Sequence, residues 1–153
     1  MLFRSELKAA ISEKTALVSV MLANNEIGTI EPIREIADIA HAHGALMFTD
    51  AVQAIGNIPV DVKELGVDML ALSGHKIHAP KGIGALYVKK GVRIDNLIDG
   101  GGQERSKRGG TENLPYIVGL ATAMESAVKR IPEMEKVASI RDYLIDELTS
   151  RVP

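Results

Sequence analysis

Residues 68–76 read Asp-Met-Leu-Ala-Leu-Ser-Gly-His-Lys, a short apolar run that ends in a cluster of polar side chains. The apolar part, 68–72, has the length and composition of a buried strand. Lys76 follows this strand, and burying a lysine amine is costly unless another group uses it. Asp50 ends a second apolar run, 45–49. The two runs therefore predict two strands, each with one charged group at its end.

Further apolar runs alternate with helical patterns around these two strands. Residues 16–21 predict a strand buried on both faces, and residues 84–88 predict a strand that is antiparallel to the others. An apolar stripe predicts a helix that starts at Pro32 and stops at Gly44. Other helices are expected over 5–12, 62–65, 112–128 and 132–148. This alternation predicts an α/β fold, a three-layer sandwich around a mostly parallel sheet.

Composition excludes several classes of function. The 153 residues suffice for roughly one domain. A net charge of −2 gives no basic surface for nucleic acid or an anionic membrane. No apolar run approaches the roughly 18 residues of a membrane span, and the start lacks a signal-peptide pattern. We therefore expect a cytoplasmic protein without nucleic-acid or membrane partners.

Cysteine and histidine usage bears on metal and redox chemistry. There is no cysteine, so disulfides, thiolate ligands and thiol nucleophiles are excluded within this chain. The four histidines do not form a metal-binding pattern, and we expect no metal site. His41 and His43 are two positions apart and are interpreted as solvated histidines at a helix end.

Open parallel sheets bind ligands beyond the carboxyl ends of their strands. Asn25, Asp50 and Lys76 each follow such an end, so the predicted fold gathers them at one rim. An amine and a carboxylate placed in this way can hold a pyridoxal 5′-phosphate (PLP) ring. The lysine would form a Schiff base with the aldehyde, and the aspartate would pair with the pyridine nitrogen. Taken singly, each residue also fits an ordinary strand end, cap or turn.

Neighbouring residues favour the cofactor interpretation. Gln53 comes one helical turn after Asp50, so its amide can reach the same edge of a ligand. His75 and Ser73 add hydrogen-bonding groups suited to phosphate. A glycine-rich segment ends in residues 109–111, Gly-Gly-Thr, which resemble a backbone nest for an anion in front of a helix. The alternative for that segment is a flexible surface loop.

Together these motifs resemble the central part of a cysteine desulfurase of the NifS/IscS type, in the class V aminotransferase family of fold type I PLP enzymes. The matching runs are 24–28, 49–53, 73–76, 80–87, 100–104 and 111–113. The resemblance implies that residues 1–130 form part of a large PLP-binding domain. It also implies that residues 131–153 form a helix leading to a small domain that is absent. This sequence has His-Ala at 78–79 where Tyr-Gly is usual, and Gly109 where serine or alanine is common.

The resemblance implies roles for individual residues. Cofactor-binding roles fall on Asn25, Asp50, Gln53, Ser73, His75, Lys76 and Thr111. Lys76 and His75 are the implied catalytic residues, with Lys76 as the Schiff-base lysine and proton shuttle. Thr111 corresponds to a threonine that reaches the phosphate of the neighbouring subunit in a homodimer, and Arg108 supports that loop.

The implied activity converts L-cysteine to L-alanine and passes sulfur, as a persulfide, to iron–sulfur cluster or thio-cofactor assembly. The implied partners are L-cysteine, a second copy of the chain, and a sulfur-acceptor or scaffold protein. The alternatives are a selenocysteine lyase, an aminotransferase, or a non-catalytic remnant that serves in dimerisation. The persulfide cysteine and the substrate-binding arginine of the small domain are missing. We therefore expect a fragment that is inactive alone, with uncovered apolar faces that promote association.

Overall fold

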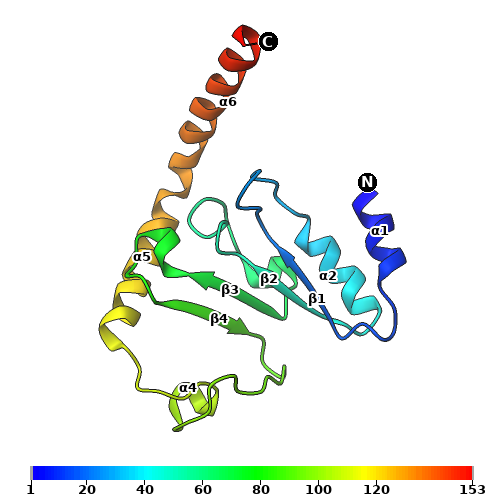
Figure 1. Ribbon diagram of the computed structural model, residues 1–153, viewed down its shortest axis with the longest axis vertical. Helices are drawn as coiled ribbons and strands as arrows, with labels where there is room; N and C mark the ends of the chain where they lie inside the picture. Colours follow the sequence, from blue (N-terminus) through cyan, green and yellow to red (C-terminus); the bar gives the residue numbers. More distant parts are fainter. Residues whose placement is uncertain (1, 153) are drawn as a thin grey trace.

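A computed structural model describes residues 2–152 and contains one mixed sheet (Figure 1). Its strands are β1 (Leu17–Met21), β2 (Leu46–Asp50), β3 (Met69–Ser73) and β4 (Gly84–Val88), in the order β1-β2-β3-β4. The first three strands are parallel and β4 is antiparallel to β3. The positions of the predicted strands are confirmed to within one residue, as is the antiparallel direction of the last. The prediction that the first strand is buried on both faces is wrong for the described residues, because only Val18 of β1 is buried and Leu17 is 47% exposed.

Helices follow the predicted pattern with small shifts at their ends. They are α1 (Leu2–Ala10), α2 (Ile33–Ala42), α3 (Val62–Leu65), α4 (Gln103–Ser106), α5 (Leu114–Arg130) and α6 (Met134–Arg151), with 3₁₀ turns η1 (Gly74–Ile77) and η2 (Ile131–Glu133). Helix α5 begins later than predicted because Asn113 caps it, its side chain accepting from the Tyr116 N–H. The sequence pattern did not predict α4, a short segment that is not a regular α-helix because Glu104 and Arg105 have left-handed φ values.

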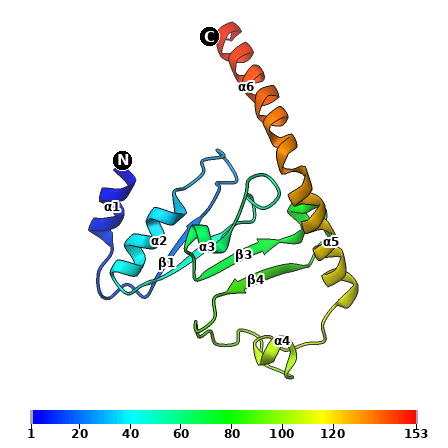
Figure 2. The ribbon, with the colours of Figure 1, turned by 180° about the vertical axis from the view of Figure 1, so that it is seen from behind.

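The core lies between the sheet and α2. Four side chains of α2 at helical spacing are fully buried, namely Ile33, Ile36, Ala37 and Ala40. They pack in one cluster with Val18 of β1 and Met47 of β2. Figure 2 shows α2 and α3 in front of the strands, on the same face of the sheet. Each fully buried isoleucine contributes about 1.5–3 kcal/mol, which fixes α2 on this face.

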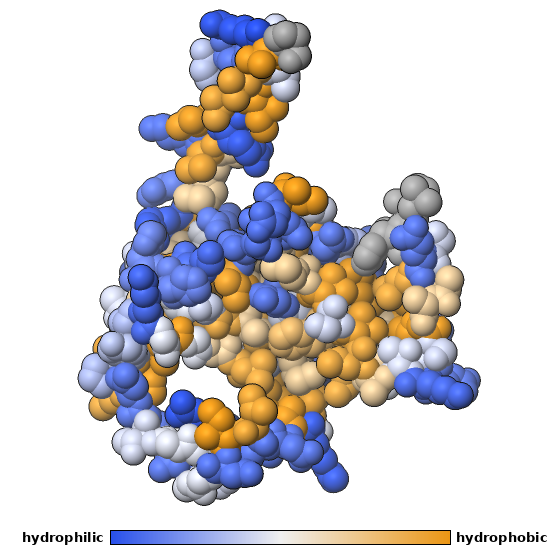
Figure 3. All heavy atoms as spheres, viewed as in Figure 1, coloured by the Kyte–Doolittle hydropathy of each residue, from blue (hydrophilic) through white to orange (hydrophobic). Residues whose placement is uncertain are grey.

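The opposite face of the sheet is only partly covered by the described residues. Side chains that alternate onto it include Leu17, which is 47% exposed, Phe48, which is half-buried, and Leu86, which is 51% exposed. In Figure 3, apolar atoms gather over the strands in this view. The predicted mostly parallel α/β sheet is confirmed, and the described residues place α2 and α3 on one side of it.

Helices α5 and α6 leave the sheet at its far end. Leu120 and Ala127 of α5 pack on Ile77 of η1, which joins α5 to the end of β3. Helix α6 projects away from the body (Figure 1), and its apolar side chains are exposed. Helix α5 ends at Arg130 and η2 begins at Ile131. The domain boundary expected between residues 130 and 131 coincides with this change, but the division into two domains stays a prediction. None of the described helices is both long and apolar enough to cross a membrane.

Candidate functional site

The carboxyl ends of the three parallel strands lie at one edge of the sheet. The register places Met21 beside Asp50 and Asp50 beside Ala71, so β1, β2 and β3 end together. Asn25 lies in the loop after β1, Asp50 is the last residue of β2, and Lys76 lies in η1 directly after β3. The structure therefore brings these predicted site residues to the same edge, as expected.

Asp50 is held rigidly at this edge. Its carbonyl oxygen accepts from the Leu22 N–H at 2.8 Å, and the next residue donates its N–H to the Ala71 carbonyl at 2.9 Å. One carboxylate oxygen, Oδ1, accepts from the Val52 N–H at 2.8 Å. No side chain among residues 2–152 donates a hydrogen bond to this half-buried carboxylate. Asp50 can therefore accept a hydrogen bond from a ligand without moving.

The turn after β3 presents Ser73, His75 and Lys76. Ser73 Oγ and His75 Nδ1 lie 2.7 Å apart, and the tautomer of the imidazole decides which atom donates. Gly74 is buried, and a Cβ there would lie 2.9 Å from Ile83 Cγ2, so only glycine fits this turn. The tight turn directs the chain so that His75 and Lys76 are exposed.

The Lys76 amine makes no hydrogen bond or ion pair with any residue in the range 2–152. The prediction that Lys76 is costly to bury is wrong for this chain, because the side chain is exposed. The polar environment of a strand end at the surface accounts for the difference. The amine is free to react with a carbonyl group, which is the chemistry that the predicted role needs.

Gln53 and Asn25 differ in how far they are engaged. Gln53 is half-buried, and its amide group has no hydrogen bond within the described part of the chain. The Asn25 amide donates to Glu26 Oε1 at 2.8 Å. Asn24 stabilises the turn instead, since its side chain accepts from the N–H groups of Glu26 and Ile27. Gln53 is thus available to a ligand, and Asn25 keeps its second N–H and its Oδ1 available beside the bond to Glu26.

Thr111 lies in the loop between α4 and α5. The loop that follows α4 lies beyond the edge strand β4 in both ribbon views (Figures 1 and 2). Within residues 2–152, no hydrogen bond connects Thr111 to Asp50 or Lys76. Thr111 therefore has no hydrogen-bonded connection to Asp50 or Lys76 among the described residues, and a contact across subunits stays a prediction.

The nest predicted for residues 109–111 is wrong in this conformation. The Gly109 N–H donates to the Ile98 carbonyl at 2.9 Å. The Gly110 N–H donates to Gln103 Oε1 at 3.2 Å. Both glycine amides are already bonded inside the loop, so Thr111 is the residue of this turn that is left to meet an anion.

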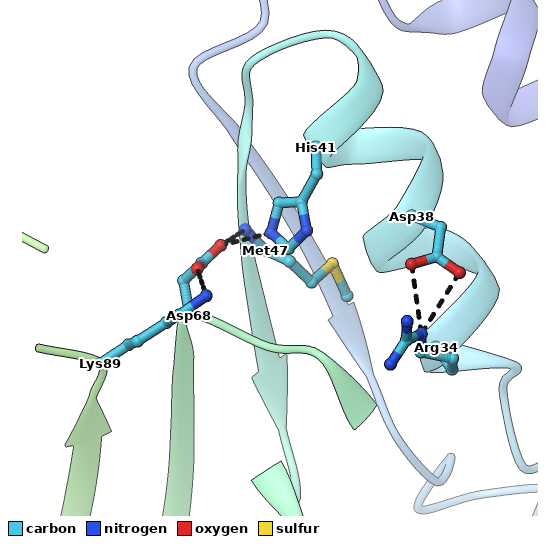
Figure 4. A network of polar contacts seen from close by, with 6 residues as sticks. All are labelled: Arg34, Asp38, His41, Met47, Asp68 and Lys89. Carbon is cyan, nitrogen blue, oxygen red and sulfur yellow. Dashed lines mark hydrogen bonds and ion pairs between the residues drawn. The ribbon is translucent and has the colours of Figure 1, made fainter. Parts of the chain in front are cut away.

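A second polar cluster lies at the opposite, amino, edge of the sheet (Figure 4). Asp68 directly precedes β3 and is 4% exposed. Its carboxylate accepts from the Met47 N–H at 2.9 Å and contacts His41 Nε2 at 2.7 Å. The Lys89 ammonium donates to the other oxygen at 3.2 Å. Three elements, α2, β2 and the end of β4, are thereby joined at one carboxylate.

The environment of Asp68 shifts its acidity. Burial raises the pKa of this carboxyl, but the hydrogen bonds from Met47, His41 and Lys89 outweigh burial and leave the pKa below its ordinary value. Asp68 therefore stays ionised in the folded protein and is held by its three donors. It has the features of a stabilising group rather than a reactive one.

The predictions for the two helix-end histidines are therefore corrected. His41 contacts the buried Asp68, and His43 Nδ1 donates to the Ile39 carbonyl at 2.9 Å near the end of α2. Sequence spacing could not predict the contact between His41 and Asp68, because β2 and α3 separate the two residues in the chain and only the folding of this segment brings them together. Among residues 2–152, no group of three or more His, Asp and Glu side chains converges as metal ligands would.

An open, mostly parallel sheet with polar and charged groups at its carboxyl edge defines an α/β domain of the ligand-binding class. The family model described as aminotransferase class-V matches residues 2–152. The chain belongs to this family, which consists of PLP enzymes.

Similar proteins carry more specific names. "Cysteine desulfurase IscS" from Clostridium botulinum (strain Hall) is 53% identical over 149 residues, which cover 97% of this chain and 38% of the relative. A solved structure named "NifS-like protein" is 46% identical with a TM-score of 0.91, over 95% of this chain and 41% of that chain. Another, "SspA in complex with cysteine", is 45% identical with a TM-score of 0.76, over 79% and 35%. The chain thus spans well under half the length of these relatives.

Proposed function

We propose that this chain is the cofactor-holding part of a PLP-dependent cysteine desulfurase. The observation that carries the proposal is that an unbonded Lys76 amine and a backbone-anchored Asp50 carboxylate lie at the ends of adjoining parallel strands. The similarity to cysteine desulfurases over 97% of the chain supports the same assignment. A solved relative named as a complex with cysteine supports L-cysteine as the substrate.

The donors and acceptors at the sheet edge fit PLP. Lys76 would hold the aldehyde carbon, Asp50 would keep a proton on the pyridine nitrogen, and Gln53 would donate to the ring hydroxyl oxygen. The Ser73–His75 pair would bind the phosphate, since one hydroxyl and one imidazole already lie 2.7 Å apart. When bound, PLP supplies an electron sink that stabilises negative charge at the substrate Cα.

The remaining chemistry falls to side chains of this chain. The Lys76 amine, once released by the incoming substrate, would take and return the proton at the substrate Cα. Asp50 would accept the hydrogen bond from the protonated pyridine nitrogen throughout the reaction, because its backbone is fixed between β1 and β3. His75 would be the second catalytic residue, since it directly precedes Lys76 in the same turn.

Sulfur transfer needs groups that these 153 residues lack. The chain contains no cysteine, so a persulfide must form on a thiol from another segment or another chain. We propose that the chain acts as a homodimer, in the cytoplasm, together with a sulfur acceptor for iron–sulfur cluster or thio-cofactor assembly. By itself it would bind PLP without completing desulfuration.

Covalent trapping tests this proposal. PLP is added to the full chain, the adduct is reduced with borohydride, and the modified lysine is located by peptide mass spectrometry. We expect modification at Lys76 in the wild type and none at that position in Lys76→Met. Lys81→Met serves as the matched control, because Lys81 is also exposed and lies close in sequence. Modification spread evenly over exposed lysines in both variants would contradict the proposal.

A further inference from the structure

The glycine-rich segment 98–111 forms a loop whose base is closed by a backbone hydrogen bond. The Gly109 N–H bonds to the Ile98 carbonyl at 2.9 Å and closes its base. A Cβ on Gly109 would lie 2.8 Å from Gly100 Cα and 2.9 Å from the Asp99 carbonyl oxygen. A side chain at position 109 would therefore meet backbone atoms on the other side of the loop. Glycine at 109 therefore lets the two sides of the loop come into backbone contact.

Gln103 bonds across this loop. Its Oε1 accepts from the Gly110 N–H at 3.2 Å. A Cβ on Gly101 would lie 2.6 Å from the same Oε1, so the Gln103 carboxamide lies directly over Gly101. Gly110 itself has a φ of +107°, a conformation that is rare for other residues. One side chain thus fixes the glycine that immediately precedes Thr111.

The backbone between Gln103 and Gly110 is strained. Glu104, Arg105 and Ser106 have φ values of 48°, 57° and 62°, in the left-handed region that is unfavourable for non-glycine residues. Such a run persists only where surrounding contacts hold it. Here the Ser106 N–H bonds to the Gly102 carbonyl at 3.1 Å, and the Lys107 ammonium bonds to the Ile94 carbonyl at 3.0 Å. These two hydrogen bonds hold the strained residues in place next to Gln103.

The hydrogen-bonding groups of this turn that have no partner within residues 2–152 suit an anion. No hydrogen bond within residues 2–152 involves the Thr111 N–H or hydroxyl. The Arg108 guanidinium lies beside Gly110, since a Cβ there would be 3.1 Å from an Arg108 Nη. The glycine amides are occupied, so a phosphate would meet Thr111 with a positive charge next to it.

We propose that Gln103 is a positioning residue that locks the Gly109–Gly110 turn and so presents Thr111 to the cofactor phosphate. The proposal rests on the proposed function for the identity of the ligand, but the lock itself concerns this chain alone. The Gln103 carboxamide restricts Gly110 before any ligand arrives, which lowers the ordering cost of phosphate binding.

Hydrogen–deuterium exchange of the full chain, without PLP, tests the lock. In Gln103→Ala we expect the Gly110 amide to exchange roughly tenfold faster, as the loss of one hydrogen bond implies. Gln103→Glu keeps an acceptor oxygen at the same reach and should restore protection. Gln103→Asn is one methylene shorter and should not. Equal exchange at Gly110 in the wild type and Gln103→Ala would overturn the proposal, as would a failure of Gln103→Glu to restore it.

A phosphate titration tests the consequence for Thr111. Inorganic phosphate is added while the Thr111 amide is followed by NMR, and we expect Gln103→Ala to weaken binding roughly tenfold. Ser106→Gly is the matched control, because it relieves strain without removing the Gln103–Gly110 bond, and it should bind phosphate like the wild type. Unchanged phosphate affinity in Gln103→Ala would overturn the positioning role. A failure of the proposed function would appear separately, as the absence of PLP at Lys76.

Discussion

The two ends of β3 carry charged residues in opposite situations. At the amino end, Asp68 is 4% exposed and has three hydrogen-bond donors from three elements. Past the carboxyl end, Lys76 is exposed and its amine has no partner within residues 2–152. A charge that is fully paired contributes to the stability of the fold. A charge that the fold leaves unpaired is available to a ligand.

Burial explains why the amino end cannot be left unpaired. A carboxylate withdrawn from water costs several kcal/mol unless hydrogen bonds replace its solvation. Asp68 receives this replacement from the Met47 N–H inside the core and from His41 and Lys89 at the surface. The carboxyl edge is more open to solvent, so Lys76 and Asp50 keep their reactivity at little cost to the fold.

The largest expected effect on stability is at the amino edge. Asp68→Ala leaves the buried Met47 N–H without an acceptor and removes contacts to α2 and to the end of β4. We expect a loss of about 2–3 kcal/mol in the free energy of unfolding, measured by urea denaturation. Asp38→Ala, which removes the exposed Arg34–Asp38 pair, should change it by less than about 0.5 kcal/mol. Equal losses in the two variants would break the comparison.

Acidification should remove the same stabilisation. The folded pKa of Asp68 lies below the ordinary value of 3.8. Its stabilising contribution is therefore fully present above the unfolded pKa and is lost as the pH falls through the lowered folded pKa. We expect the stability difference between the wild type and Asp68→Asn to stay constant near neutral pH and to shrink below about pH 4. A difference that does not change with pH would contradict the assigned ionisation.

The surface partners of Asp68 should each matter less. Lys89→Met removes an ammonium that is half exposed, so we expect a loss of only about 0.5–1 kcal/mol in urea denaturation. His41→Ala should cost about 1 kcal/mol, because the imidazole donates to an ionised group. A loss in either single variant that equals the loss in Asp68→Ala would show that this partner, and not the buried Met47 N–H, dominates.

The smallest expected effect on stability is at the carboxyl edge. Lys76→Met removes an exposed amine without partners, so the free energy of unfolding should change by less than about 0.5 kcal/mol. The same change should abolish covalent attachment of PLP. This separation between stability and ligand binding would sharpen the contrast between the two edges. A strongly destabilised Lys76→Met would remove the contrast.

The sequence predicts the strands well and long-range polar contacts poorly. Apolar runs identify β1 to β4, although β4 is largely exposed within the described residues. Parallel strands bring Asp50 and Lys76 to one edge by geometry alone. The His41–Asp68 contact depends on how the β2 crossover folds, which no spacing rule gives. The bonds of Gly109 and Gly110 inside their own loop depend on a left-handed run at 104–106 that non-glycine residues rarely adopt.

One measurement tests the central claim most directly, namely that the carboxyl edge is a PLP site independent of the fold's stabilising charges. It compares the urea midpoint of the wild type, Lys76→Met and Lys81→Met with and without excess PLP. A ligand that binds only the folded state raises the midpoint. We predict a PLP-dependent increase in the wild type and Lys81→Met, and none in Lys76→Met. An equal increase in Lys76→Met, or no increase in the wild type, would contradict the account.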